Sequence, residues 1–229
     1  MPPFARPDIT PVTRSITLPA GGTVLHADLD LPKGRADGLV IFAHGSGSSR
    51  RSPRNRAVAA HLRTAPLATL LLDLLTEDED AEEAAGGVLR FDVARLAERL
   101  VAALEWTRNE PTLRGTKAGL FGASTGAAAA LVAAASKPTW VGAVVSRGGR
   151  PDLAGPALAG VRTPTLLIVG GDDPEVLELN RRAMEAMPAA VDLEVVPGAS
   201  HLFEEPGALD EVARLARGFF RRHLLPRWP

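Results

Sequence analysis

The sequence predicts an α/β protein, with one mostly parallel sheet of eight strands, helices on both faces and no large cap. Two observations predict this fold class. Short apolar runs of strand length alternate with longer segments of helical character, as in parallel sheets whose crossover connections are helices. Turns rich in glycine and polar residues directly follow the apolar runs, at the strand ends where sites form in such sheets. The 229 residues, 45% of them hydrophobic, suit a single domain over residues 1–229.

The expected strands are apolar or β-forming runs bounded by turn residues. The first two flank a Pro-Ala-Gly-Gly turn and predict a hairpin, after a proline-rich segment, residues 1–12, that is expected to be irregular. The later runs are continuously apolar, which is typical of strands buried on both faces. In chain order the expected strands are 14–18, 23–31, 39–43, 67–72, 117–121, 141–145, 165–169 and 193–196.

The expected helices carry apolar residues at helical spacing or consist of strong helix formers. Proline is favoured at the first position of a helix, so one helix is expected to begin at Pro53. The acidic, glycine-broken stretch 76–87 is interpreted instead as a solvated loop. In chain order the expected helices are 53–63, 91–109, 127–135, 176–187 and 209–224.

Composition excludes several classes of function. Lys and Arg number 26 against 27 Asp and Glu, so there is no electrostatic case for nucleic acid or an anionic membrane as a partner. Cysteine is absent, which excludes disulfides, thiolate metal sites and a cysteine nucleophile. No His and carboxylate spacing suggests a metal, and no cofactor is expected. The N-terminus lacks an apolar signal segment and no run suits a membrane span, so a cytoplasmic location is expected.

The chain contains one G-x-S-x-G pattern, at Gly122 to Gly126, between an expected strand and an alanine-rich helix. Such a sharp turn brings backbones close together, so Gly122 and Gly126 stand where side chains would clash. Ser124 is then exposed at the start of the helix, where unpaired N–H groups favour an anion. The pattern predicts Ser124 as a nucleophile, although a small-residue packing turn would look similar.

A serine nucleophile needs a base, and the base needs a carboxylate to orient it. Of five histidines, His201 alone lies in a turn directly after the last expected strand. Asp172 and Asp173 close the strand before it. The resulting chain order, serine, acid, histidine, is the order of α/β-hydrolases.

Stabilising the negative charge on the attacked carbonyl oxygen requires an oxyanion hole. One backbone N–H is expected from the residue after the nucleophile, here Thr125, and another from the loop after an earlier strand. The loop that begins His44-Gly45-Ser46 follows such a strand. The backbone N–H of Ser46 is therefore the second predicted donor.

The chain resembles the α/β-hydrolases, and more narrowly the dienelactone hydrolase group, in five motifs: HGSGSS at 44–49, GASTG at 122–126, SRGGRPDLAG at 146–155, GGDD at 170–173 and GASHLFEEPG at 198–207. The resemblance implies a catalytic triad of Ser124, Asp173 and His201, because the family's glycine, acid and apolar spacing fits Gly170, Asp173 and Val176. Dienelactone hydrolases proper use cysteine as nucleophile. The implied activity is therefore that of a general carboxylesterase or lactone hydrolase, with a small-molecule ester as substrate.

Two arginines, Arg147 and Arg150, follow the strand expected next to that of Ser124. In one interpretation a guanidinium faces the pocket and holds a substrate carboxylate with its two parallel N–H groups. The group's carboxylate-bearing substrates agree with this. In the other, Arg147 pairs with a carboxylate such as Asp152, and Arg150 is solvated.

Two other functions are considered. Gly45-Ser46-Gly47 after a strand, with Asp73 closing the next, would suit a dinucleotide-binding protein, but Arg50 occupies the third glycine position of that fingerprint. A hydrolase fold kept as a non-catalytic binding module is the second alternative. It would usually have lost a triad residue, and all three are present.

Overall fold

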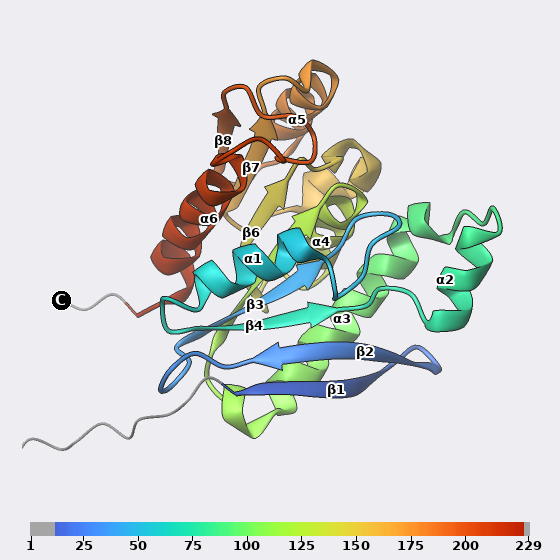
Figure 1. Ribbon diagram of the computed structural model, residues 1–229, viewed down its shortest axis with the longest axis vertical. Helices are drawn as coiled ribbons and strands as arrows, with labels where there is room; N and C mark the ends of the chain where they lie inside the picture. Colours follow the sequence, from blue (N-terminus) through green and yellow to red (C-terminus); the bar gives the residue numbers. More distant parts are fainter. Residues whose placement is uncertain (1–11, 227–229) are drawn as a thin grey trace, which may run out of the picture.

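An eight-stranded sheet forms the centre of the computed structural model, which describes residues 12–226 (Figure 1). β1 and β2 form an antiparallel hairpin, β2 lies antiparallel to β4, and all other neighbours are parallel. The predicted fold class is confirmed. In spatial order the strands are β1 (Thr13–Ala20), β2 (Thr23–Asp30), β4 (Leu67–Leu72), β3 (Gly38–Ala43), β5 (Lys117–Ala123), β6 (Val141–Arg147), β7 (Thr165–Gly170) and β8 (Val191–Val196).

Helices cover both faces of the sheet (Figure 1). α1 (Pro53–Leu62) and α6 (Ala208–Leu224) pack on one face. α3 (Val93–Asn109), α4 (Thr125–Ser136) and α5 (Pro174–Ala186) pack on the other. Short 3-10 helices occur at Leu89–Phe91, Pro111–Leu113 and Pro151–Gly160. The last of these is all that stands between β6 and β7, so no large cap is inserted there.

The continuous apolar runs are strands that are covered on both sides. β3, β4 and β7 are buried at every position, whereas the edge strand β8 alternates between exposed and half-buried residues until its end. This difference follows from position, because β8 lies at the edge of the sheet, where the helix layers cover its residues less fully. Of the segment 1–12 that is predicted to be irregular, residues 1–11 lie outside the described part of the chain.

The interpretation of residues 76–87 as a solvated loop is wrong, because they include helix α2 (Glu77–Ala84). Thr76 and Glu79 form a capping box: each side chain accepts a hydrogen bond from the other's backbone N–H, at 3.2 and 2.9 Å. Glu79 also pairs with the buried Arg99 of α3, and this guanidinium lowers the pKa of Glu79 to about 2. The acidic run is therefore a helix start docked on α3.

The start of α4 packs against the end of β3 without any intervening side chain. A Cβ atom placed on Gly126 would lie 2.4 Å from the carbonyl oxygens of both Ala43 and His44. A Cβ on Gly122 would lie 2.4 Å from the Cα of Ala127. All these contacts are with backbone, which cannot rotate away as a side chain can. The close approach therefore requires glycine at both positions.

We expect Gly126→Ala to lower the free energy of unfolding by roughly 1–3 kcal/mol or more, because backbone must shift to admit the methyl group. The matched control is Gly218→Ala in α6, where an added Cβ meets no atom within 4 Å. There alanine should raise stability by about 0.5–1 kcal/mol through its helix propensity. Urea unfolding of both variants measures this, and equal effects would contradict the close packing.

Candidate active site

Ser124 occupies a strained turn between β5 and α4. Its backbone has φ 50° and ψ −122°, a conformation that residues other than glycine rarely adopt. Its N–H donates to the carbonyl of Arg147 at 3.2 Å, and its own carbonyl accepts from the N–H groups of Ala127 and Arg150, both at 3.1 Å. Hydrogen bonds to the next strand and to the following turn thus hold Ser124 in this conformation.

His201 and Asp173 are brought together from two neighbouring loops. The Nδ1 of His201 lies 2.7 Å from the Oδ2 of Asp173, whose side chain is 15% exposed. Because an ionised carboxylate only accepts, Nδ1 carries the proton in this bond and Nε2 of a neutral ring is left as an acceptor. Asp172 is exposed, and its backbone N–H donates to the carbonyl of Ala199 at 3.0 Å. Asp173, and not Asp172, therefore contacts His201.

Ser124 and His201 border the same turn, residues 148–150. A Cβ on Gly148 would lie 3.6 Å from the Cε1 of His201 and 3.0 Å from its carbonyl oxygen. The same turn bonds to Ser124 through the N–H of Arg150. Within residues 12–226 no hydrogen bond joins Ser124 to His201. The structure thus places the two residues at one edge of the sheet, beside a shared turn.

The loop predicted to supply the second oxyanion donor lies against the turn of Ser124. A Cβ on Gly45 would be 3.1 Å from the Cβ of Ser124 and 3.2 Å from the carbonyl oxygen of Ala123. The hydroxyl groups of Ser46 and Thr125 are 3.1 Å apart and hydrogen-bonded. The two residues predicted to donate backbone N–H groups are therefore neighbours.

His44 holds the beginning of this loop, a role that sequence reasoning missed. Its Nε2 accepts from the backbone N–H of Leu74 at 3.0 Å, so its Nδ1 carries the proton that is shared with the carbonyl of Gly45 at 2.9 Å. Burial lowers the pKa of His44, which keeps this ring neutral. Its place at the end of a buried strand, one residue before a glycine, was the available signal.

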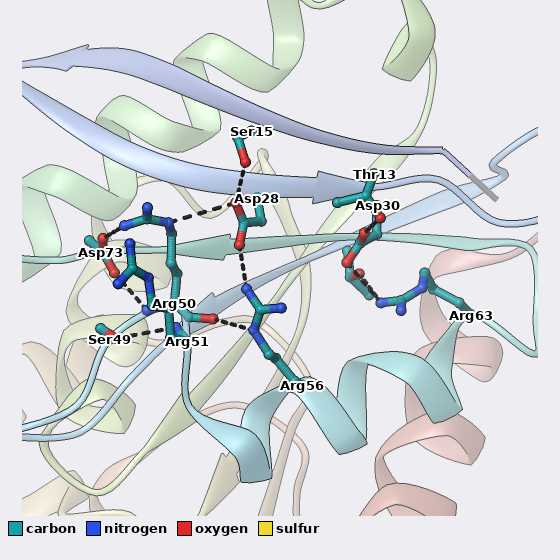
Figure 2. Close-up of polar contacts among 11 residues, drawn as sticks. Thr13, Ser15, Asp28, Asp30, Ser49, Arg50, Arg51, Arg56, Arg63 and Asp73 are labelled. Carbon is teal, nitrogen blue, oxygen red and sulfur yellow. Dashed lines mark hydrogen bonds and ion pairs between the residues drawn. The ribbon is translucent and has the colours of Figure 1, made fainter.

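Arg50 holds the end of the loop through a cluster of charged residues that the sequence did not predict (Figure 2). Its backbone N–H donates to the Oδ1 of Asp73 at 2.6 Å, and its guanidinium pairs with the other oxygen of the same carboxylate. The Nε of Arg50 lies 3.7 Å from Asp28 of β2, which Arg56 also contacts at 2.6 Å. Asp73, which a dinucleotide site would need for the ribose, is thus engaged by Arg50.

Arg147 and Arg150 differ from the second interpretation given above, in which Arg147 pairs and Arg150 is solvated. Arg150 forms two hydrogen bonds to Asp152, of 2.9 and 2.7 Å. Arg147 is 7% exposed, and its Nε and Nη1 are buried without a hydrogen-bond partner in the described chain. Burial, and then the nearby Arg54, lower the pKa of Arg147 to about 10, so the side chain remains charged at neutral pH.

A small cleft adjoins the loop of residues 44–48. Apolar side chains from the β4–α2 connection and from α3, namely Leu74, Leu75 and Leu96, line it together with Thr125, and so do Asp80 and Arg90. A larger cleft involves Leu39 and Ala118, near the starts of β3 and β5, at the opposite edge of the sheet. Only the first can be part of a site around Ser124.

The described residues give no support to two other kinds of site. Within residues 12–226, no three or more His, Asp or Glu side chains gather in a way that would hold a metal ion. None of the helices in that range combines the length and apolar character needed to cross a membrane.

A family pattern and two crystal structures relate this chain to known hydrolases. The pattern of the dienelactone hydrolase family matches residues 38–222. The crystal structure of a dienelactone hydrolase from Anabaena variabilis is 52% identical, covering 93% of this chain and 99% of that one, with a TM-score of 0.90. A Xanthomonas campestris protein described as an α/β serine hydrolase without lid is 22% identical, covering 95% and 97% of the two chains, with a TM-score of 0.75.

One curated relative has a name from another class of enzyme. A putative phosphoribosyl transferase of Mycobacterium tuberculosis is 54% identical over 205 residues, which are 90% of this chain. These residues are 45% of that protein, so the chain spans less than half the length of this relative.

Proposed function

The chain belongs to the dienelactone hydrolase family of α/β-hydrolases, and from this premise we propose that it cleaves small carboxylic esters through an acyl-enzyme on Ser124. The observation that carries the proposal is the 2.7 Å hydrogen bond between His201 and Asp173 at the sheet edge where Ser124 stands in its strained turn. A base, an acid that orients it and an exposed hydroxyl are the parts that acyl transfer requires.

In the proposed reaction His201 acts as general base. With Nδ1–H bound to Asp173, Nε2 accepts the proton of the Ser124 hydroxyl while the serine oxygen bonds to the ester carbonyl carbon. When the tetrahedral intermediate collapses, the bond to the alkoxy oxygen breaks and His201 returns the proton to the departing alcohol. Water, activated by the same base, then releases the acid from Ser124.

The negative charge on the carbonyl oxygen would be stabilised by the backbone N–H groups of Ser46 and Thr125. Three observations support this assignment. Thr125 is the first residue of α4, where helix N–H groups lack intrahelical partners. Ser46 is bound to it through the hydroxyls. His44 and Arg50 fix the two ends of the loop that carries Ser46.

The surroundings of Ser124 favour small substrates. The adjoining cleft is small, with Leu74, Leu75 and Leu96 as apolar lining, and only the short 3-10 segment 151–160 follows β6. We therefore propose short acyl or alcohol groups rather than long lipid chains. The transferase name belongs to a relative more than twice as long as the matched region, whereas the family pattern over residues 38–222 of this chain supports a hydrolase.

We further propose that Arg147 binds a carboxylate of the substrate. An unpaired buried guanidinium is costly, since no neighbouring group offsets the loss of its hydration. Nε and Nη1 are fully buried without partners. An anionic group would supply the partner that the described chain lacks.

Replacing Ser124 or His201 by alanine should each lower kcat on the order of a millionfold, because the triad acts as one unit. A fluorophosphonate probe should label Ser124 in the unaltered protein and nothing in Ser124→Ala. Hydrolysis of p-nitrophenyl acetate, with far-UV circular dichroism to verify folding, provides the measurement. A folded Ser124→Ala protein that keeps its esterase activity would refute the mechanism and favour a non-catalytic role for this serine.

Asp173→Asn should lose several orders of magnitude in kcat, because an amide no longer selects the Nδ1–H tautomer of His201. Asp172→Asn is the matched control one position away and should cost little, since that side chain is exposed. Kinetics of both variants on the same ester decide between them. The reverse order of effects would assign the acid to Asp172.

Arg147→Gln should raise KM for p-nitrophenyl hemisuccinate by about tenfold or more and leave KM for the similarly sized p-nitrophenyl butyrate almost unchanged, because only the first ester offers a carboxylate. Arg182→Gln, which removes an exposed arginine paired with Glu178, is the control. Equal changes for both esters would make Arg147 a structural residue.

A further inference from the structure

The loop that carries Ser46 is bonded at its two ends to two consecutive residues, one at each end. His44, at its start, accepts a hydrogen bond from the N–H of Leu74. Arg50, at its end, is bound through backbone and side chain to Asp73. Asp73 and Leu74 are consecutive and directly follow β4. Residues 45–49 thus form a short loop whose two flanking residues, His44 and Arg50, are both bonded to the turn directly after β4.

The two contacts that hold the ends of the loop are chemically different. The His44 contact joins an uncharged, buried ring directly after β3 to a backbone N–H. The Arg50 contact is an ion pair in which both side chains are about five-sixths buried, with exposed fractions of 16% and 15%. A charge-assisted pair that is shielded from water is stronger and more directional than one on the surface.

Arg50 is itself held from a second side. Asp28 of β2 lies 3.7 Å from its Nε, and Arg56 of α1 bonds both to Asp28, at 2.6 Å, and to the carbonyl of Arg50, at 3.3 Å. Figure 2 shows Arg50 between the two carboxylates, with Arg56 reaching Asp28 from α1. The position of Arg50 is therefore fixed from three places: β2, α1 and the turn directly after β4.

We infer that Arg50, with Asp73 and Asp28, forms a clamp that positions the backbone N–H of Ser46 for the oxyanion. This inference rests on the proposed function, and Arg50 acts in it as a positioning residue that does not touch the substrate. Donors aimed at a transition state act only when they are held in place, and a displacement of about 1 Å can cost on the order of a hundredfold in rate.

Loss of the clamp should change kcat and local hydrogen exchange, whereas loss of a merely structural ion pair should change only stability. Since the negative charge on the oxygen develops only in the transition state, a less firmly held loop 44–50 should lower kcat and leave KM nearly unchanged. It also leaves residues 44–50 less protected from hydrogen exchange, whatever the reaction is.

Figure 2 also supplies a matched control, the ion pair of Arg63 with Asp30. It joins the end of α1 to β2 at 3.1 Å, and its side chains have similar exposed fractions of 24% and 16%. In the described part of the chain, neither of its side chains has a hydrogen bond or ion pair with the loop 44–50; the Arg63 side chain bonds only to Asp30 and Thr69. Loss of this pair should affect stability alone.

The experiment compares Arg50→Ala with Arg63→Ala in the full chain, using p-nitrophenyl acetate. Arg50→Ala should lower kcat by about ten- to a hundredfold with KM within about twofold. Amide exchange, measured by mass spectrometry, should accelerate in residues 44–50. Arg63→Ala should change neither, although both variants lose some thermal stability. Arg50→Lys, which keeps a charge opposite Asp73, should recover part of kcat.

An unchanged kcat together with unchanged exchange in Arg50→Ala would overturn the clamp, and so would an equal fall in kcat for Arg63→Ala. If Arg50→Ala does not fold, Asp73→Asn gives the same test, because its amide oxygen still accepts the N–H of Arg50 but carries no charge. The exchange measurement needs no turnover. It therefore judges the clamp even if Ser124→Ala proves active and the proposed function fails.

Discussion

The rest of the site depends on the close backbone-to-backbone packing of the start of α4 against the ends of β3 and β5. At Gly126 the helix start meets the carbonyls of Ala43 and His44, and at Gly122 the strand end meets Ala127. A chain that passes from strand to helix in so little space has few conformations available, and Ser124 takes one with φ 50°. The strain is balanced by hydrogen bonds to Arg147, Ala127 and Arg150. The same approach brings the loop of Ser46 beside the serine.

The register of the parallel strands aligns the turn of Ser124 with the turns that hold the other candidate site residues. Ala43 pairs with Gly122, and Gly122 with Ser146, so the turns after β3, β5 and β6 begin at the same level. Gly170 pairs with Val196, so the turns that carry Asp173 and His201 also begin at the same level. Because parallel strands all end at one edge, residues up to 157 positions apart, such as His44 and His201, come to border one site.

Within residues 12–226, buried and half-buried carboxylates pair with arginines around the site, whereas the buried Arg147 has no ion-pair partner. Asp73 and Asp28 face Arg50, and Glu79 faces Arg99. These pairs connect the loops and helices around the site to the sheet. Arg147 has no such partner although it is almost entirely buried. Arg147 therefore differs from the paired arginines in having its Nε and Nη1 buried without a hydrogen-bond partner in the described chain.

The sequence by itself determined the alternation of strands and helices, the position of the serine turn and the membership of the family, because each depends on residues close together in the chain. Apolar runs and glycine spacing express local backbone and burial requirements directly. The family spacing already favoured Asp173 over Asp172, but only the tertiary structure showed the contact of Asp173 with His201. Only the tertiary structure also decided that Arg150 and not Arg147 pairs with Asp152, and that Arg50 binds Asp73. The contacts of His201 with Asp173 and of Arg50 with Asp73 join residues 28 and 23 positions apart, and the direction of a side chain in such a turn depends on the folded backbone. The acidic stretch shows the same limit, because α2 is stabilised by Arg99, 20 residues from Glu79, as well as by its own capping box.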